Sequence, residues 1–221
     1  MESVWVIVPL YDEAPVIHDV IAGLLTEFPN VVCVDDGSED GSAEEAERAG
    51  AVVVRHPINL GQGAAIQTGV AFGLSDPMAQ YFVTFDADGQ HLPADAVAMV
   101  ERLKAGEADV VFGSRFLEGP SEAGLVKRSV LKVAVGYSNV ATGVHLSDTH
   151  NGLRAFNRRV AEQLDLRQNR MAHASEIIEQ VGAMHASYVE HPVHILYTDY
   201  SRRKGQSLWN SVNILTEMLY K

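Results

Sequence analysis

The sequence is poor in cysteine, in positive charge and in long apolar runs, and each shortage excludes a class of protein. Its one cysteine, Cys33, lies in an apolar run, so we expect a buried thiol in a reducing cytoplasm and no internal disulfide. With 17 Lys and Arg against 29 Asp and Glu, the net charge of −12 argues against a nucleic-acid binder. No run reaches the ~18 apolar residues of a membrane span, and the first residues do not form a secretory signal.

Short apolar runs alternate with segments of helical periodicity along the 221 residues. The runs predict strands at Ser3–Val8, Val31–Val34, Ala51–Val54, Tyr81–Phe85, Asp109–Phe112 and Ser187–Leu196, and Asp148–Phe156 predicts a turn into a strand. Helices are predicted over Val16–Phe28, from Ser42, from Asn59 to Leu74, and over Pro93–Lys104, Arg158–Leu164, Ala174–Met184 and Leu208–Tyr220. Ser42 and Glu45 have the spacing of a capping box. This order predicts an α/β fold with a mainly parallel sheet flanked by helices.

Acids and amides gather directly after the predicted strands or at the starts of helices. They are Glu13, Asp35, Asp36, Gln62, Asp86, Asp88 and Gln90. In open α/β sheets, ligands bind at the carboxyl ends of the strands. We therefore expect one binding site at that edge.

The stretch Phe85–His91 carries the most specific chemistry. Asp86 and Asp88 are two residues apart at the end of a strand, so their side chains can face one point. Two converging carboxylates repel unless a cation lies between them, and hard oxygen ligands select Mg²⁺ or Mn²⁺. Gln90 offers a neutral oxygen to the same cluster. A solvated acidic turn is the alternative, because a D-x-D pattern alone is common.

Five motifs occur together in a fixed order. They are Val8–Glu13, Val34–Ser38, Asn59–Gly63, Asp86–His91 and Gly113–Phe116. Together they resemble the family 2 inverting glycosyltransferases of the GT-A fold, and the chain is most similar to the dolichyl-phosphate and polyprenyl-phosphate sugar synthases. Asp148–Phe156 and Ser201–Ser207 resemble later motifs of that branch. The resemblance implies one GT-A domain with a nucleotide-sugar-binding half (1–115) and an acceptor-binding half (116–221).

The resemblance also implies a pocket for a GDP- or UDP-linked sugar. It would be formed by Pro9, Tyr11, Glu13, Asp36, Gln62, Asp86, Ala87 and Asp88. Asp36 would accept from a base N–H and Glu13 from ribose hydroxyls, although Asp35 and Asp36 also suit a simple turn cap. Asp88 would be the direct metal ligand, with Asp86 in support and Gln90 in the same shell. Two positions depart from the family pattern, because many relatives carry Lys at Gln62 and Asn at Asp12.

Two acceptor chemistries are compatible with the later part of the chain. A lipid monophosphate is already an anion and needs cations but no base, and Arg115, Arg128 and Arg202 would hold it. A hydroxyl acceptor needs a general base, for which Glu176 is the candidate. Glu176 also suits a helix N-terminal acid that complements the helix dipole, and Arg128 suits a solvated helix charge.

We therefore expect hexose transfer to a polyprenyl phosphate at the cytoplasmic face of the membrane. Leu125–His145 and Leu208–Tyr220 have apolar faces that suit a membrane interface, the cover of a sheet or a homodimer contact. The rival within the class is transfer to a soluble hydroxyl with Glu176 as base. A nucleotidyltransferase usually carries a Gly-rich basic loop where this chain has Pro9–Glu13, and the acidic cluster argues against an inactive nucleotide-sugar-binding module.

Overall fold

A seven-stranded sheet forms the centre of the computed structural model, which describes residues 1–117, 144–169, 172–197 and 200. The strands are β1 (Val4–Leu10), β2 (Asn30–Asp35), β3 (Val52–Arg55), β4 (Tyr81–Thr84), β5 (Val110–Ser114), β6 (Arg154–Asn157) and β7 (Tyr188–Pro192). The helices are α1 (Ala14–Leu25), α2 (Ser42–Ala49), α3 (Gln62–Leu74), α4 (Pro93–Lys104), α6 (Arg158–Ala161) and α7 (His173–Ala183). The predicted α/β class is confirmed.

The strand order is β3-β2-β1-β4-β6-β5-β7. All neighbouring pairs are parallel except those of β6, which runs antiparallel between β4 and β5. Because β6 is reversed, its first residue, Arg154, lies opposite Thr84 of β4 and Phe112 of β5, near the carboxyl ends of those strands. The loop before β6 therefore reaches the edge at which the sequence predicts the site.

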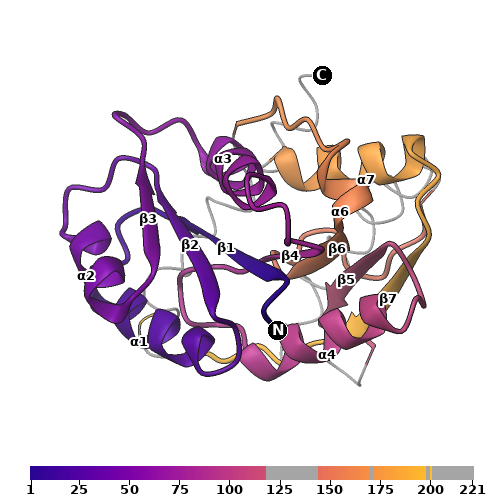
Figure 1. Cartoon of the computed structure of the whole chain (residues 1–221), viewed down its shortest axis with the longest axis horizontal. Helices are drawn as coiled ribbons and strands as arrows, with labels where there is room; N and C mark the ends of the chain where they lie inside the picture. Colours follow the sequence, from indigo (N-terminus) through magenta and orange to yellow (C-terminus); the bar gives the residue numbers. More distant parts are fainter. Residues whose placement is uncertain (118–143, 170–171, 198–199, 201–221) are drawn as a thin grey trace, which may run out of the picture.

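Two apolar layers cover the two faces of the sheet. Ile17 of α1 and Met99 of α4 pack in one layer, and Ile66 of α3 and Ile177 of α7 pack in the other. Figure 1 shows α1, α2 and α4 on one side of the sheet and α3, α6 and α7 on the other. Burial on both faces explains why β1 and β2 read as nearly continuous apolar runs.

The start of α2 differs from the sequence prediction. Gly41, not Ser42, is the N-cap, and its φ of 89° is one that glycine adopts easily. Ser42 is the first helical residue, and its Oγ accepts a hydrogen bond from the backbone N–H of Glu13 at 2.8 Å. Glu45 pairs with Arg48 on the same helix. The predicted capping box is wrong, because the serine is used to hold the loop after β1.

Two later elements are shorter than predicted. The helix expected over Arg158–Leu164 ends at Ala161, and the strand expected to reach Leu196 ends at Pro192, which has no N–H to donate to a neighbouring strand. Arg128, Arg202 and nearly all of Leu125–His145 and Leu208–Tyr220 lie outside the described residues. No helix in the described part of the chain is both long and apolar enough to cross a membrane.

Candidate functional site

A cavity of about 480 Å³ opens at the carboxyl edge of the sheet. Its lining is Pro9, Leu10, Tyr11, Glu13, Asp36, Asn59, Gly61, Gln62, Ala65, Asp86, Ala87 and Asp88. Every residue that the sequence predicts for the donor pocket is in this lining. They come from the ends of β1, β2 and β4 and from the start of α3. The volume lies within the range of small-molecule sites, roughly 300–1,000 Å³.

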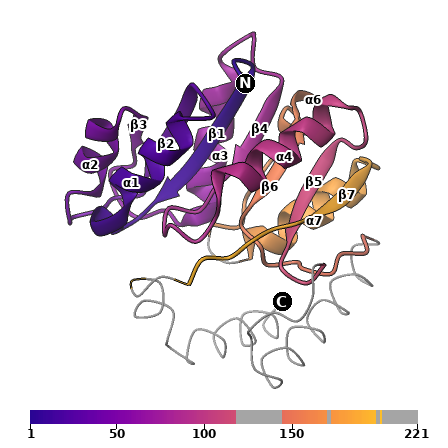
Figure 2. The ribbon, with the colours of Figure 1, turned by 90° about the horizontal axis from the view of Figure 1, so that it is seen from below.

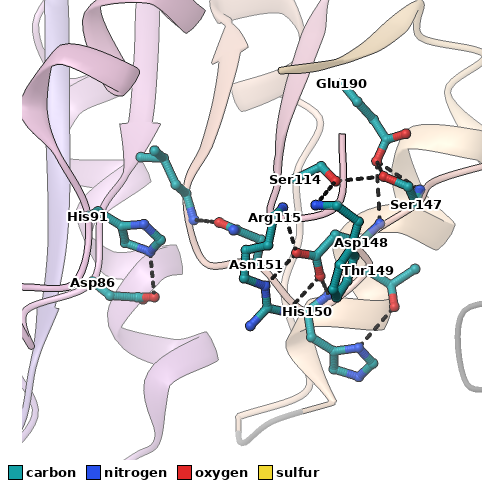
Figure 3. Close-up of polar contacts among 12 residues, drawn as sticks. Asp86, His91, Ser114, Arg115, Ser147, Asp148, Thr149, His150, Asn151 and Glu190 are labelled. Carbon is teal, nitrogen blue, oxygen red and sulfur yellow. Dashed lines mark hydrogen bonds and ion pairs between the residues drawn. The ribbon is translucent and has the colours of Figure 1, made fainter. Parts of the chain in front are cut away.

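Asp86 and Asp88 follow β4 and lie in different electrostatic environments. Asp86 Oδ2 lies 3.1 Å from His91 Nε2, and its Oδ1 accepts from Gln62 Nε2 at 3.2 Å. Figure 3 shows His91 directed at Asp86. Burial raises the pKa of Asp86, but the bond with His91 and the nearby positive charges outweigh it, and the pKa is lowered. The pKa of Asp88 is raised to about 6, first by burial and then by the charge of Asp86.

This electrostatic pattern fits a cation between the two carboxylates. Asp86 and Asp88 would supply its protein oxygens, and the charge of Asp86 that raises the pKa of Asp88 would be offset. Nowhere in the described chain do three or more His, Cys, Asp or Glu side chains form a metal cluster. A pair of carboxylates suits Mg²⁺ or Mn²⁺ that completes its coordination with ligand phosphates. Gln90 lies on the same turn, where its backbone N–H donates to Asp88 Oδ1 at 3.1 Å.

Gly152, in the loop before β6, sets the position of Asp86. A Cβ added at Gly152 would lie 2.1 Å from Asp86 Oδ2 and 2.5 Å from its Cγ. The carbonyl of Gly152 accepts a hydrogen bond from Thr84 Oγ1 at 2.7 Å, which fixes the loop on β4. No sequence pattern indicates this role of Gly152, although Asp148–Phe156 resembles a later motif of the family.

Arg154, two residues later, is 2% exposed, and its Nε and Nη1 make no hydrogen bond in the structure. Burial lowers the pKa of Arg154 to about 10, against the charges of Asp86 and Asp148. No pattern in the sequence indicates this buried cation. The sequence predicts a turn into a strand within Asp148–Phe156, and β6 confirms it, but no pattern indicates that this strand runs antiparallel between β4 and β5.

Asp36 joins the cavity to the loop before α3. Its Oδ1 accepts from the backbone N–H of Leu60 at 2.9 Å, and its Oδ2 accepts from Gly61 at 2.7 Å. His56 Nδ1 lies 2.7 Å from Oδ1. Asp36 therefore positions a loop that is distant in the sequence, which is more than a turn cap. Asp35 does have the capping role, because its Oδ1 accepts from the N–H of Ser38 at 3.2 Å.

Asp12 departs from the family pattern without changing the backbone that this position needs. Its φ is 52°, a left-handed conformation that Asn and Asp both tolerate. Asp12 Oδ1 accepts from the N–H of Glu39 at 3.2 Å, and the N–H of Asp12 donates to Ser38 Oγ at 3.0 Å. The substitution of Asn by Asp therefore keeps the turn after β1.

Arg115 forms a two-bond ion pair with Asp148. Its Nε and Nη2 donate to Asp148 Oδ2 and Oδ1 at 2.6 and 2.8 Å, and Figure 3 shows the two side chains facing each other. The side chain of Asp148 is 2% exposed and that of Arg115 is 29% exposed. Burial would raise the pKa of Asp148, but the Arg115 guanidinium holds it below its usual range. A guanidinium has five N–H groups, so this pairing orients Arg115 without using all of its donors.

Asp148, the ion-pair partner of Arg115, is held in place by Glu190 of β7. Glu190 Oε1 accepts from the backbone N–H of Ser147 at 2.8 Å and from that of Asp148 at 3.3 Å. Ser147 Oγ lies 2.6 Å from Ser114 Oγ, so this hydrogen-bond network also includes the last residue of β5. Sequence reasoning found Arg115 but missed Asp148 and Glu190, which position it.

Glu176 lies in the first turn of α7 and is not among the cavity-lining residues. Its carboxylate accepts from the backbone N–H of Arg167 at 3.1 Å and from that of Gln168 at 2.9 Å. The carbonyl of Gln168 lies 2.1 Å from where a Cβ on Gly63 would be. Glu176 thus holds a segment that packs against the start of α3, and this contact favours a structural role.

Comparison with known proteins identifies the family of the chain. Residues 5–165 match the family described as glycosyl transferase family 2. A UDP-N-acetylglucosamine–dolichyl-phosphate N-acetylglucosaminyltransferase of Methanococcus voltae is 28% identical over 244 residues, covering 98% of this chain and 94% of that protein. A polyprenol monophosphomannose synthase of Mycolicibacterium smegmatis is 32% identical over 171 residues, covering 73% of this chain and 64% of that protein.

Solved structures share the fold. Glucosyl-3-phosphoglycerate synthase from Mycobacterium tuberculosis, in complex with Mn²⁺, uridine diphosphate and phosphoglyceric acid, superposes with a TM-score of 0.69. The alignment covers 92% of this chain and 74% of that one at 15% identity. At this identity the likeness concerns the fold alone, and it agrees with the GT-A architecture implied by the five sequence motifs.

Proposed function

The chain belongs to glycosyl transferase family 2, and on that premise we propose a metal-dependent, inverting transfer of a hexose from a GDP- or UDP-linked donor to a polyprenyl phosphate. The observation that carries this proposal is the pair Asp86 and Asp88 in the wall of the cavity, with the pKa of Asp88 raised to about 6 by burial and by its neighbour. Such a pair favours a bound divalent cation together with a ligand that brings phosphate oxygens.

The donor would lie along the cavity from Asp36 to Asp88. Asp36 and Glu13, which both line the cavity, would accept hydrogen bonds from the base and the ribose, and Gln62 links the start of α3 to Asp86. The glutamine amide donates to Asp86 where many relatives carry a lysine, so the neutral residue keeps a contact with the acidic cluster. A metal ion bound there would offset negative charge on the leaving nucleoside diphosphate.

The acceptor would approach from the side of Arg115. An oxygen of the acceptor phosphate would attack the anomeric carbon and form the new bond. The bond to the nucleoside diphosphate would break, and its oxygen would keep the electron pair. No proton has to be removed, because a phosphate monoester is already anionic at neutral pH. Arg115 would hold this phosphate with the guanidinium donors that Asp148 does not use.

The names of the relatives support this acceptor over a soluble hydroxyl, since two of them are named for dolichyl phosphate and polyprenol monophosphomannose. The contacts of Glu176 agree, because its carboxylate is engaged by two backbone N–H groups and is not among the cavity-lining residues. We further propose that the enzyme works at the cytoplasmic face of the membrane, where a lipid phosphate is accessible, and that 1–115 and 116–221 are its donor and acceptor halves.

Binding and turnover together test the proposal. Titration calorimetry with GDP and UDP should show affinity that depends on Mn²⁺ and is lost in EDTA or in Asp88→Ala. Asp19→Ala is the matched control, because the Asp19 side chain is 95% exposed on α1. A radiolabelled-sugar assay with polyprenyl phosphate should then show transfer, and flotation with liposomes should show membrane association. Equal nucleotide affinity with and without metal would refute the metal's role.

A further inference from the structure

The segment after β7 crosses from one side of the site to the other. We name residues 193–197 and Tyr200 the C-terminal strap. Figure 2 shows the chain leaving β7 and running toward the β1–α1 side of the sheet. Three backbone hydrogen bonds hold this segment: the N–H of Val193 donates to the Ser114 carbonyl at 3.0 Å, that of His194 to Asp95 Oδ2 at 2.8 Å, and that of Leu196 to the Gln90 carbonyl at 2.8 Å. Ile195 also forms a β-bridge with His91. The strap is therefore bonded to the turn that carries Asp88.

The strap ends on the opposite wall of the donor cavity. Tyr200 Oη donates a hydrogen bond to Glu13 Oε2 at 2.7 Å. Glu13 is only 9% exposed, and its own backbone N–H is held by Ser42. The two residues are 187 positions apart in the chain, so this contact joins the end of the described chain to the loop after β1.

The phenol of Tyr200 stays a neutral donor. Burial raises its pKa, and the bond with Glu13 and the negative charges of Glu13, Asp40 and Asp88 raise it further. A carboxylate has about four acceptor positions, and one O–H donor occupies one of them. A hydrogen bond from the Tyr200 phenol therefore helps to orient the Glu13 carboxylate in the cavity wall.

We propose that Tyr200 is a positioning residue that orients the Glu13 carboxylate toward the vicinal hydroxyls of a nucleotide ribose. The inference rests on the proposed function, in which Glu13 faces the ribose of the donor. It gives the strap a role in recognition, because one end of the strap is bonded to the metal-binding turn and the other end to the ribose-binding acid. A nucleoside diphosphate that lacks one ribose hydroxyl would lose a hydrogen bond to Glu13, so its affinity would depend less on Tyr200.

Tyr200→Phe removes the hydroxyl and keeps the ring. Affinities for UDP and GDP and for their 2′-deoxy counterparts are measured by calorimetry in Mn²⁺. We expect the variant to bind the ribonucleotides about tenfold more weakly, as for loss of one hydrogen bond to a charged group. Binding of the deoxynucleotides should change less, so that the ribose preference shrinks. Tyr81→Phe is the control, because Tyr81 lies at the amino end of β4, away from the cavity.

A double-mutant cycle separates an effect through Glu13 from any other. In a Glu13→Ala background, Tyr200→Phe should change neither nucleotide affinity nor ribose preference. An unchanged ribose preference in Tyr200→Phe alone, or an equal loss of affinity in both backgrounds, would overturn the inference and leave the proposed function standing. Failure of the wild-type protein to bind any nucleoside diphosphate would overturn the proposed function and this inference with it.

Discussion

Replacement of Gly152 by alanine tests whether the loop before β6 positions the acidic pair. The new Cβ would lie 2.1 Å from Asp86 Oδ2 and 2.5 Å from both Cγ and Oδ1. Real Cβ contacts essentially never fall below 3.0 Å, so the carboxylate and the loop must separate by about 1 Å. Asp86 cannot simply rotate away without cost, because His91 and Gln62 hold its two oxygens.

A shift of this size should act mainly on catalysis. Misplacement of a catalytic group by about 1 Å costs on the order of 10²-fold in rate, equivalent to about 2.7 kcal/mol of activation free energy. Overpacking should also lower the free energy of unfolding, by about 1–3 kcal/mol. We therefore expect Gly152→Ala to fold, to melt several degrees below the wild type, and to turn over about a hundredfold more slowly with weaker Mn²⁺ activation.

The assay is initial-rate kinetics at varied Mn²⁺ concentration, with melting curves recorded on the same preparations. Gly23→Ala is the matched control, since the nearest atom to its added Cβ is Pro93 Cγ at an ordinary 3.8 Å. Gly23 lies within α1, where alanine is the better helix former by roughly 0.5–1 kcal/mol. Wild-type turnover and wild-type Mn²⁺ dependence in Gly152→Ala would refute the claim that this glycine positions Asp86.

Three further predictions concern single side chains of the site. The pKa of Asp88 is raised from 3.8 to about 6, so metal-free protein should lose stability as pH rises through that interval. In EDTA at pH 7.5, the free energy of unfolding of Asp88→Asn should therefore exceed that of the wild type by up to about 3 kcal/mol. At pH 4 the two proteins should have nearly the same melting temperature. Arg115→Ala should raise the acceptor KM about 30-fold with little change in the donor KM. It should also lower the melting temperature, because Asp148 is left buried without its cation. A rise confined to the donor KM in steady-state kinetics would assign Arg115 to the donor. Glu176→Gln should keep transfer to polyprenyl phosphate near the wild-type rate and lower the melting temperature slightly. A Glu176→Gln enzyme that is dead toward that lipid would restore the general-base role.

Local patterns were enough to predict most of the sheet and the donor side of the cavity. β1, β2 and β4 are buried on both faces, so each reads as an apolar run that ends in polar residues. Asp36, Asp86 and Asp88 follow such strands directly, and parallel strands bring their carboxyl ends together whatever the details of packing. The strand pattern therefore predicted that Asp36, Asp86 and Asp88 meet at one edge of the sheet, and the family resemblance supplied the other predicted residues of the donor pocket.

The contacts that orient those residues depend on long-range geometry and were missed. Asp148 meets Arg115 across 33 positions, and Tyr200 meets Glu13 across 187. Neither pairing leaves a periodic signal, because each joins loops whose positions depend on strand order. The capping box at Ser42 failed for the same reason, since the Ser42 hydroxyl binds the N–H of Glu13 on a different loop.

The reversed strand β6 explains how the later part of the chain reaches a site built by the earlier part. A parallel strand at that place would deliver its preceding loop to the opposite edge of the sheet. Because β6 runs antiparallel between β4 and β5, the loop before it arrives at the carboxyl edge, with Gly152 against Asp86 and Asp148 against Arg115. One loop thus touches both the proposed metal site and the proposed phosphate site. A change in this loop should therefore alter donor and acceptor kinetics together, whereas a change in the loop after β1 should alter donor kinetics alone.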